Sequence, residues 1–381
     1  MDESTLLYAG KVRNVYQISD KHLLLEATDR TSGFNKYICN IPNKGVLLNM
    51  MSAFWFDKTK HIIPNHLIHY DDRYSIVKKC TPFKIEVVVR GYITGNTTTS
   101  LWHHYKNGCR NYCGLDIKDG LVKNQKLDKP IITPTTKCDE DKPISKEEIL
   151  KQYYITEEEL DFIYDKVYKL FEYGQEVAKK AGFILVDTKY EFGRDENNNI
   201  ILIDEVHTCD SSRYWILDEY VKRFNEGRSQ KNLDKDHVRR YLVENHGDFV
   251  RGEVEVETHN IPIEIKDNVL NAYLELYNRL CVGKESLIKD RQGLYELSGI
   301  DHSTIINNYF NFIHPIVVIL AGSKTDADFI GKFEKKLWER KIHFHKHYYS
   351  AHRNTLEVVR ILEHYNNMKS YGRKIVFVTV A

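Results

Sequence analysis

Two apolar, strand-like runs that carry carboxylates constrain this chain more than any other feature. The segment 183–210 reads FILVDTKYEFGRDENNNIILIDEVHTCD, with an asparagine-rich turn between the runs. If the turn is centred between Asn197 and Asn198, the antiparallel register places Glu191 opposite Asp204. Like charges that face each other on a sheet are destabilising, but a hard cation such as Mg²⁺ between them would stabilise the pair. The hairpin therefore predicts a metal site of the kind used in nucleotide-dependent chemistry.

The alternation of side chains along the first run supports this interpretation. Asp187, Lys189 and Glu191 are expected on one strand face, together with Phe183 and Leu185. An alternative interpretation is that both carboxylates are solvated at the end of an exposed hairpin. Both faces begin with apolar side chains, and only one ends in charge. This pattern favours a hairpin that is anchored in a core and opens its polar end into a cleft.

Length, charge and cysteine content exclude several classes of protein. A chain of 381 residues is long enough for two or three domains, and a net charge of +1 gives no reason to expect a nucleic-acid or membrane surface. Its 7 cysteines contain no C-x-x-C pair, which argues against a disulfide framework or a structural zinc module. No segment approaches the ~20 apolar residues needed to span a bilayer, and the start of the chain resembles no leader peptide. We therefore expect a soluble, cytoplasmic protein.

Strands and helices are expected to follow each other in blocks along the first three quarters of the chain. Short strand-like runs occupy 12–18, 23–28 and 83–89, with a helical stretch at 47–60. Helical patterns follow at about 145–180, where Ser145-Lys-Glu-Glu148 forms a capping box, and at 266–280. This order favours an α+β fold over a regular βαβ repeat.

The last part of the chain has a different pattern. Strands are expected at 316–320, 342–349 and 375–380, with helices between them, which predicts the start of an α/β doubly wound parallel sheet. Ligands of such sheets bind beyond the carboxyl ends of the strands, where Ala321-Gly-Ser323 and Ser350-Ala-His-Arg353 fall. Alternate histidines at 343, 345 and 347 also suggest zinc, but solvent exposure on an edge strand explains them better.

Two motifs outside the hairpin carry charge beside glycine. Gly10-Lys11 precedes a strand, which suits a loop that closes over phosphates, although an ordinary surface lysine is the commoner outcome. Arg90 ends an apolar run before Gly91 and could grip a carboxylate or phosphate with two hydrogen bonds. Arg213 would add a further cation near the proposed metal.

The ordered combination of these motifs is more specific than any one of them. They are GKVRNVY (10–16), ATDR (27–30), KG (44–45) with FWF (54–56), VRGYITG (89–95), QKL (125–127) with TPTTK (133–137), DTKYEFG (187–193), and IDEV (203–206) with DSSRYW (210–215). In this order they closely resemble the phosphoribosylaminoimidazole-succinocarboxamide synthase (SAICAR synthetase) family over residues 1–285. The resemblance implies a SAICAR synthetase domain at 1–290, in which a small β-rich subdomain (1–92) covers ATP above a larger α+β subdomain (93–290).

The resemblance also implies a ligase reaction in de novo purine biosynthesis. ATP would phosphorylate the carboxylate of carboxyaminoimidazole ribonucleotide (CAIR). The amine of L-aspartate would then displace phosphate, giving SAICAR, ADP and phosphate. Such chemistry depends on positioning and charge neutralisation more than on a protein nucleophile. The alternatives are a non-catalytic nucleotide-binding scaffold, a remnant of a bifunctional synthetase/carboxylase, and a kinase-like phosphotransferase.

Site residues are carried over from the resemblance by motif. Those implied for ATP and its Mg²⁺ are Lys11, Arg13, Glu86, Lys189, Glu191 and Asp204, of which Glu191 and Asp204 would bind the metal and Lys189 would act in catalysis. Those implied for CAIR are Arg90, Ser100, Asp210, Arg213, Lys235 and Arg239, with Asp210 and Arg213 closest to the chemistry. Asn96 is an alternative to Ser100. Thr28, Asp29 and Arg30 would line the shared cleft.

The tail at 314–381, after a linker at 291–313, resembles part of a second family, the phosphoribosylaminoimidazole (AIR) carboxylases. The residues that match its substrate site are Gly322, Ser323, Asp326, Ser350, His352 and Arg353. His352 is the candidate proton carrier, because an imidazole suits that role near neutral pH. A loop expected after Ala381 would complete the pocket, so we expect little or no carboxylase activity from this chain. A homo-oligomer is also expected to be possible.

Overall fold

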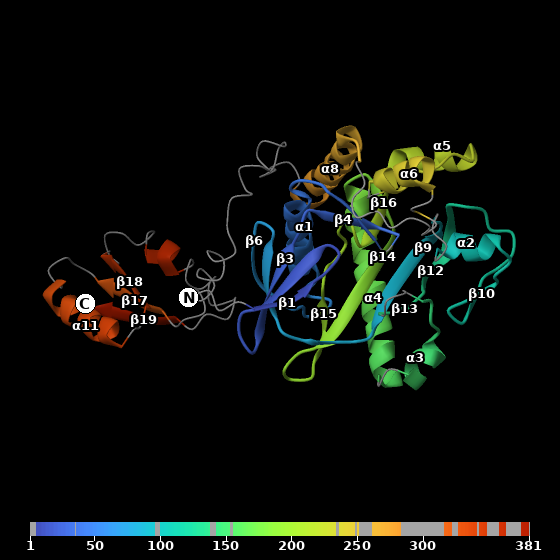
Figure 1. Cartoon of the computed structure of the whole chain (residues 1–381). Coiled ribbons are helices and arrows are strands. Elements are labelled where there is room, and N and C mark those ends of the chain that lie inside the picture. The colour runs from blue at the N-terminus through green and yellow to red at the C-terminus, as the bar shows by residue number, and fades with distance from the viewer. Residues whose placement is uncertain are drawn as a thin grey trace. The chain divides into compact units, whose positions relative to one another are not determined.

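The computed structural model describes residues 5–34, 36–95, 100–137, 142–152, 155–233, 236–247, 250, 261–282, 316–321, 327–340, 343–348, 358–362 and 375–380. The chain divides into two compact units, one over Glu3–Gly299 and one over Ile300–Ala381 (Figure 1). The predicted linker at 291–313 lies outside the described residues, and the predicted domain boundaries stay predictions.

A 5-stranded antiparallel sheet begins the first unit, in the order β1-β2-β3-β7-β6. Its strands are β1 (Thr5–Ala9), β2 (Arg13–Gln17), β3 (His22–Ala27), β6 (Leu67–Asp71) and β7 (Tyr74–Lys78). A separate hairpin, β4 (Arg30–Gly33) and β5 (Lys36–Asn40), leads into helix α1 (Lys44–Thr59). Most of α1 is buried, which is expected of a helix that packs on several sides inside a core. The predicted strands and the predicted helix in this part of the chain are confirmed.

A 7-stranded sheet forms the centre of the first unit. Its path is β12 (Gln125–Ile132), β9 (Ile85–Ile93), β14 (Phe183–Arg194) and β15 (Ile200–Ile203), while β13 (Thr135–Thr136) pairs with β9, and β8 (Thr81–Pro82) and β16 (Ser212–Ile216) pair with β14. Strands β9 and β14 lie side by side and are buried over most of their length. The sheet therefore holds β14 firmly along both of its edges.

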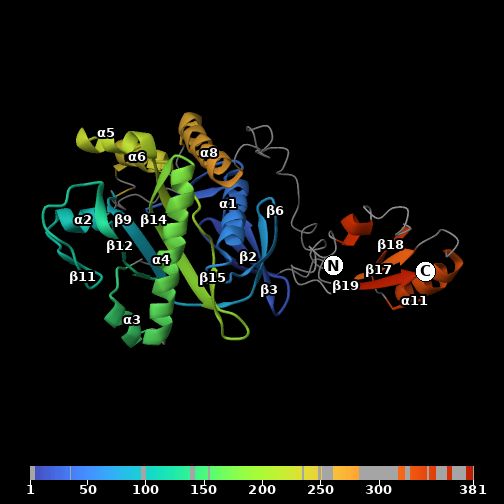
Figure 2. The same cartoon turned by 180° about the vertical axis from the view of Figure 1, so that it is seen from behind.

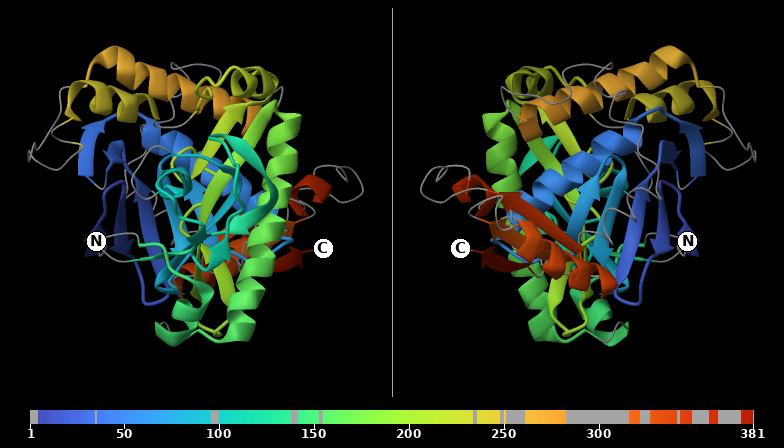
Figure 3. Two further views of the ribbon diagram at one scale, coloured as in Figure 1. Left: turned by 90° about the vertical axis from the view of Figure 1, so that its right-hand side faces the viewer. Right: turned by 90° about the vertical axis from the view of Figure 1, so that its left-hand side faces the viewer.

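Helices cover this sheet and close its ends. The longest is α4 (Glu157–Lys180), which runs along β14 and β9 (Figure 2). The others are α2 (Leu101–Lys106), α3 (Lys146–Gln152), α5 (Leu217–Asn225), α6 (Asp236–Asn245) and α8 (Ile263–Tyr277), with a π-helical turn at Asn278–Val282. Helices α6 and α8 pack together at one end of the unit (Figure 3). A short hairpin, β10 (Asn111–Tyr112) and β11 (Leu115–Asp116), follows α2.

The helical pattern at 145–180 forms two helices because it contains two capping boxes. Ser145 and Glu148 exchange side-chain to backbone hydrogen bonds at the start of α3. Thr156 and Glu159 do the same at the start of α4. Each pair satisfies backbone N–H groups that a new helix leaves without partners. The capping box at Ser145 was predicted, whereas the one at Thr156 was not.

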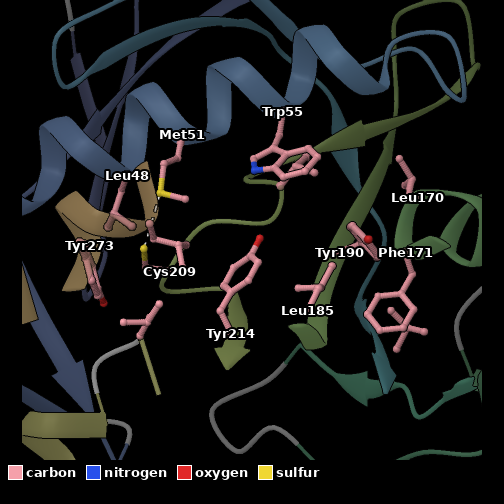
Figure 4. Close-up of a cluster of buried hydrophobic side chains, with 14 of the residues drawn as sticks. Leu48, Met51, Trp55, Leu170, Phe171, Leu185, Tyr190, Cys209, Tyr214 and Tyr273 are labelled. Atoms are coloured by element: carbon pink, nitrogen blue, oxygen red, sulfur yellow. Dashed lines mark hydrogen bonds between the residues drawn. The ribbon is translucent and has the colours of Figure 1, made fainter. Parts of the chain in front are cut away.

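The main core joins elements that are far apart in the sequence. Trp55 and Met51 of α1 lie among side chains of β14, α4 and α8, as Figure 4 shows. Cys209 contributes its thiol 3.5 Å from Met51 Sδ. The described cysteines are free thiols. Because α1 and β14 share this core, the N-terminal elements and the central sheet are held as one structure.

The β14–β15 hairpin pairs one residue out of the predicted register. Glu191 lies opposite Ile203, whereas the prediction placed it opposite the next residue. The reason lies in the turn, where the carboxylate of Asp195 accepts the N–H groups of Asn197 and Asn199, both at 2.9 Å. Such an aspartate-centred turn leaves a loop of odd length, so it is centred on Asn197 and not between two residues.

The predicted strand faces were also wrong in part. The pairing of β14 with β16 is irregular between Leu185 and Asp187. Phe183 and Leu185 therefore lie in the main core with Tyr190 and Phe192, whereas Ile184 and Val186 lie in a separate cluster with Tyr92 and Trp215. A bulge exchanges the faces of a strand in this way. As a result, Asp187, Lys189 and Glu191 lie on the face opposite to the main core, whereas the prediction placed them on the face of Phe183 and Leu185.

The second unit contains a 3-stranded parallel sheet in the order β18-β17-β19. Its described elements are β17 (Ile316–Ala321), α11 (Ala327–Glu339), β18 (His343–Tyr348), a short helical segment at 358–362 and β19 (Ile375–Val380). The side chains of His343 and His345 are not described, so the zinc interpretation is not tested.

Candidate active site

Lys189 is the centre of a cluster of carboxylates on β14. Its Nζ atom lies 2.7 Å from Glu191 Oε1, 2.9 Å from Glu86 Oε1 and 3.8 Å from Asp204 Oδ2. Glu86 comes from the neighbouring strand β9, and Asp204 follows the end of β15. Asp204 has a φ of 65°, a left-handed backbone conformation. Glu191 and Asp204 therefore approach the same ammonium group although they do not face each other across the ladder.

Two further cations flank these carboxylates. Arg13 of β2 pairs with Asp204 and places its second nitrogen 3.0 Å from Glu205 Oε2. Lys137, just after β13, pairs with Glu191. The cluster thus contains carboxylates and cations in contact, which is how buried charges are usually found.

Protonation in the cluster follows from burial and these pairs. Burial disfavours the charged form of Asp204, but the charges of Arg13 and Lys189 outweigh it and hold its pKa below the ordinary value. Burial raises the pKa of Glu191, and Lys189 opposes this only in part. Burial alone would lower the pKa of Lys189, yet the surrounding carboxylates raise it well above its ordinary value. Lys189 is therefore a cation, and Asp204 is an anion, over the whole physiological range.

The same carboxylates fit Mg²⁺ only in combination with a phosphate ligand. Within the part of the chain that the structure describes, no group of three or more His, Cys, Asp or Glu side chains is arranged to hold a metal ion by itself. Mg²⁺ is commonly held by one or two carboxylates together with substrate phosphates and water. The oxygen donors of Glu191 and Asp204 meet that requirement, and the predicted pair therefore fits a metal that arrives with a nucleotide.

A cavity of about 350 Å³ is lined in part by residues of β9, β16 and α6. The side chains that line it with positive charge are Arg90, Lys123, Arg213, Arg239 and Arg240. Thr94, Ser100, Asn124 and Asn232 add hydrogen-bonding groups, and Phe34, Trp215 and Val243 add apolar surface. So many cations around one cavity indicate an anionic ligand, because arginine binds phosphate and carboxylate groups in two-point contacts.

Asp187 orients two of the arginines that line the cavity. Its Oδ2 atom lies 2.8 Å from an Arg213 guanidinium nitrogen and 3.7 Å from one of Arg90. Strand pairing explains the arrangement, because both arginines lie directly opposite Asp187, Arg90 on β9 and Arg213 on β16. Arg90 also donates to Thr133 Oγ1 at 2.9 Å. The central strand thus fixes two cations at one wall of the cavity.

Asp210 is held below the cleft by buried partners. Lys44 Nζ lies 2.9 Å from Asp210 Oδ2, and the Tyr273 hydroxyl donates to Asp210 Oδ1 at 2.6 Å. Both Lys44 and Asp210 are almost fully buried. These contacts join the start of α1 and the helix α8 to the segment between β15 and β16. They position the chain from which Arg213 emerges.

The other predicted residues have the following places. Lys11 is exposed in the turn between β1 and β2, two residues before Arg13. Asp29 accepts the N–H of Gly45 at 3.1 Å and lies 3.3 Å from Arg73. Ser100 lines the cavity and also caps α2. Lys235 and Asn96 lie outside the described residues, as do Gly322, Ser323, Asp326, Ser350, His352 and Arg353.

Sequence reasoning missed several groups of this site. They are Lys44, Lys123, Lys137, Asp187, Glu205 and Arg240. Asp187 was expected on the same strand face as Lys189 and Glu191, but it was given no role in the site. Lys137 and Lys123 come from loops beside the sheet, and no periodic pattern in the sequence relates them to β14. The geometry as a whole defines an enzyme that brings a phosphate donor next to a second anionic substrate.

Comparison with known proteins identifies the family. The family model described as SAICAR synthetase matches residues 6–253. A phosphoribosylaminoimidazole-succinocarboxamide synthase from Legionella pneumophila is 47% identical over 72% of this chain and 86% of the relative. The chloroplastic enzyme of that name from Arabidopsis thaliana is 46% identical over 75% of this chain and 69% of the relative. The chain therefore belongs to the SAICAR synthetase family, and the predicted ligase family is confirmed.

Solved structures agree with this assignment. A SAICAR synthase from Saccharomyces cerevisiae complexed with SAICAR superimposes with a TM-score of 0.64 at 32% identity, covering 75% of this chain and 98% of that one. A type-2 SAICAR synthetase in complex with ADP gives 0.53 at 25% identity, covering 73% and 98%. The predicted α+β fold of the family is confirmed for the first unit.

Location and assembly stay predictions. Among the described helices, none is both long enough and apolar enough to cross a membrane. The Arabidopsis relative is chloroplastic, so membership of the family does not by itself place this chain in the cytoplasm. The possible homo-oligomer is not tested.

Proposed function

We propose that this chain joins the carboxylate of CAIR to the amine of L-aspartate at the expense of ATP, giving SAICAR, ADP and phosphate. One observation carries the proposal. Asp187, Lys189 and Glu191 alternate along β14. Asp187 pairs with Arg90 and Arg213, which line the cavity, whereas Lys189 and Glu191 belong to the carboxylate cluster. Alternate residues of a strand are only about 6.7 Å apart. A phosphate donor at the cluster and an acceptor in the cavity would therefore lie within reach of each other.

The cavity would hold CAIR. This nucleotide carries a phosphate and a carboxylate, and Arg90, Arg213 and Arg239 line the cavity with guanidinium groups that match both anions. Arg90 and Arg213 are held by Asp187, so they are positioned before the substrate binds. Lys235 would join Arg239 at the ribose phosphate. The Saccharomyces cerevisiae relative solved in complex with SAICAR supports a ligand of this class in the family.

The carboxylate cluster would hold the nucleotide triphosphate. Lys11, on the turn beside Arg13, would close over the phosphates, and Glu86 would contribute to the same site. Glu191 and Asp204 would hold Mg²⁺, which when bound supplies charge neutralisation between the phosphates. Lys189 would supply a cation for the phosphoryl group. The relative solved with ADP supports nucleotide binding in the family.

The reaction needs two displacements. A carboxylate oxygen of CAIR attacks the terminal phosphorus of ATP, and the bond to ADP breaks. The aspartate nitrogen then attacks the acyl carbon, the bond from carbon to the phosphate oxygen breaks, and the nitrogen loses a proton. Lys189 and Arg213 would neutralise the charge that develops on the phosphoryl and acyl oxygens. Asp210 would help to place the imidazole nucleotide, and Thr28, Asp29 and Arg30 would line the aspartate side of the cleft.

A coupled assay of ADP release tests the proposal. The expected result is release that requires both CAIR and L-aspartate, and a Lys189→Met variant should lower the rate by about 100-fold or more. Lys21→Met is the matched control, since Lys21 forms an exposed ion pair with Glu196. ADP release without aspartate would favour a kinase-like phosphotransferase. Nucleotide binding without any turnover would favour a non-catalytic scaffold.

We also propose that the second unit is related to AIR carboxylases. Its parallel order β18-β17-β19 is compatible with the doubly wound sheet that the motifs predicted. The residues carried over from that family, including His352, lie outside the described residues, so the proposal depends on the sequence resemblance. An assay for carboxylation of aminoimidazole ribonucleotide with bicarbonate or CO₂ tests this relation.

A further inference from the structure

The tip of the β4–β5 hairpin has an unusual residue for its backbone conformation. Gly33, the last residue of β4, pairs with Lys36, the first residue of β5, and Phe34 directly follows Gly33. Phe34 has a φ of 52°, a left-handed conformation that glycine and asparagine adopt readily and bulky side chains rarely do. Backbone strain of this kind persists where the surrounding structure enforces it, and it concentrates at ligand sites.

The strained residue reaches the arginine-lined cavity. Phe34 lines the cavity although it belongs to the N-terminal elements, and it packs in part against the main core. A side chain on Gly33 would meet Arg239 Cγ at 3.8 Å, so the hairpin lies near the aliphatic stem of Arg239, which also lines the cavity. Phe34 therefore adds an aromatic ring to the cavity wall near Arg239.

The hairpin holds its tip in place from the other end. Arg30, the first residue of β4, donates to Gly10 O at 2.8 Å and to Asn14 Oδ1 at 2.7 Å. The buried Lys44 donates to Arg30 O at 3.0 Å. Because the base of the hairpin is fixed by these contacts, the ring at the tip is positioned before a ligand binds. Such preorganisation lowers the cost of ordering a binding surface.

The other apolar groups of the cavity are less suited to contact a planar ring face to face. Trp215 is buried, with a relative exposure of 1%, and its Nε1 donates to Asn232 Oδ1 at 2.7 Å. Val243 is aliphatic. Phe34 is therefore the aromatic group best placed to stack on a heteroaromatic base whose phosphate and carboxylate are held by the arginines.

We propose that Phe34 determines the base specificity of the cavity by stacking on the imidazole ring of the nucleotide. The inference rests on the proposed function, because it takes CAIR as the ligand. It adds that the ring of the base is recognised in addition to the two anionic groups. Removal of the ring should therefore weaken binding of the nucleotide and leave binding of a ribose phosphate unchanged.

Calorimetric titration with CAIR and with ribose 5-phosphate tests this difference. Phe34→Leu keeps an apolar side chain, and we expect about tenfold weaker CAIR binding with unchanged ribose 5-phosphate binding. Phe34→Tyr restores the ring and should bind CAIR within about twofold of the unmodified protein. Asn198→Gly is the control, because Asn198 also has a positive φ, of 64°, but lies in the β14–β15 turn. It should change neither affinity.

The outcomes separate this inference from the proposed function. Equal losses for CAIR and ribose 5-phosphate in Phe34→Leu, or no loss for either, would overturn the stacking role alone. Absence of CAIR binding to the unmodified protein would overturn the proposed function and the inference with it. An unchanged thermal unfolding midpoint for Phe34→Leu excludes a loss of fold as the cause of weaker binding.

Discussion

Lys189 Nζ lies 2.7 Å from Glu191 Oε1, and the same ammonium group lies 2.9 Å from Glu86. The ammonium group of Lys189 therefore neutralises carboxylates that include Glu191, one of the two predicted metal ligands. Glu191 and Asp204 would hold Mg²⁺ together with nucleotide phosphates, and the metal when bound would supply further positive charge at these oxygens. Lys189 would supply a protein cation for the phosphoryl group at the same place.

Removal of one carboxylate should weaken the metal site without unfolding the protein. Asp204→Asn keeps the size of the side chain but removes an anion that Arg13 and Lys189 stabilise. We expect the turnover number to fall by about 100-fold or more, because the metal and the phosphates lose a ligand charge. Electron paramagnetic resonance of Mn²⁺ with a nucleotide should show weaker metal binding in the same variant.

Asp165→Asn provides the control for this substitution. Asp165 forms an exposed pair with Lys169 on α4, at 2.8 Å, and contacts none of the cluster residues named above. Its turnover and its Mn²⁺ affinity should match those of the unmodified protein. Unchanged turnover in Asp204→Asn would remove Asp204 from the metal site.

Arg213→Lys tests the geometry of the cavity and not only its charge. The guanidinium of Arg213 can contact Asp187 and a substrate anion at once, whereas an ammonium group cannot reproduce this planar fork. We expect the KM for CAIR to rise by about tenfold or more, while the KM for ATP changes little. Arg228→Lys is the control, because Arg228 forms an exposed pair with Glu226. A larger effect on ATP than on CAIR would contradict the assignment of the cavity.

The fold of the first unit followed from the sequence where local patterns decide structure. The alternation of apolar residues predicted β14, and the apolar stretch at 47–60 predicted α1. Both segments are largely buried, so their apolar patterns alone indicated the structure that they form. Strands β12 and β16 were not predicted. Their residues pair with β9 and β14 from distant parts of the chain, and only the assembled sheet makes them strands.

The site shows the same division between local and distant information. Lys189 and Glu191 were placed correctly beside each other because they alternate on one strand. The predicted pairing of Glu191 with Asp204 was wrong because the side chain of Asp195 sets the turn, a contact that alternation does not reveal. Lys137 contacts Glu191, but the two residues are 54 positions apart in the sequence and no periodic pattern relates them.

Asp29 offers a test between a structural role and a role in substrate binding. Its carboxylate accepts the N–H of Gly45 at the start of α1, where anionic groups stabilise a helix. Asp29→Asn keeps an acceptor for this hydrogen bond, so the free energy of unfolding should fall by less than about 1 kcal/mol. Asp29→Ala removes the acceptor and should cost about 1–2 kcal/mol.

Kinetics of the same two variants separate the roles. If Asp29 binds a substrate in addition, Asp29→Asn should raise the KM for L-aspartate or CAIR although it leaves stability nearly unchanged. A KM that changes only in Asp29→Ala, together with a lower unfolding midpoint, would limit Asp29 to capping α1.

Asp72 should make the protein more stable in mild acid than at neutral or higher pH. Both of its carboxylate oxygens are buried without a hydrogen-bond partner in the described structure. Burial raises the pKa of Asp72 to about 6, although the charge of Arg73 opposes the shift. The folded protein therefore favours the neutral carboxyl group. Its contribution to stability is complete below the unfolded pKa of about 3.9 and is lost as the pH rises through about 6.

Asp72→Asn should keep that contribution at every pH because the amide cannot ionise. Asparagine also tolerates the positive φ of this position, 48°. We expect the variant to be more stable than the unmodified protein at pH 8, by up to about 3 kcal/mol, and equal to it near pH 4. Denaturant unfolding at both pH values measures the difference, with Asp71→Asn as the neighbouring control. A gain of equal size at pH 4 would mean that a change in packing, and not the charge of Asp72, causes the effect.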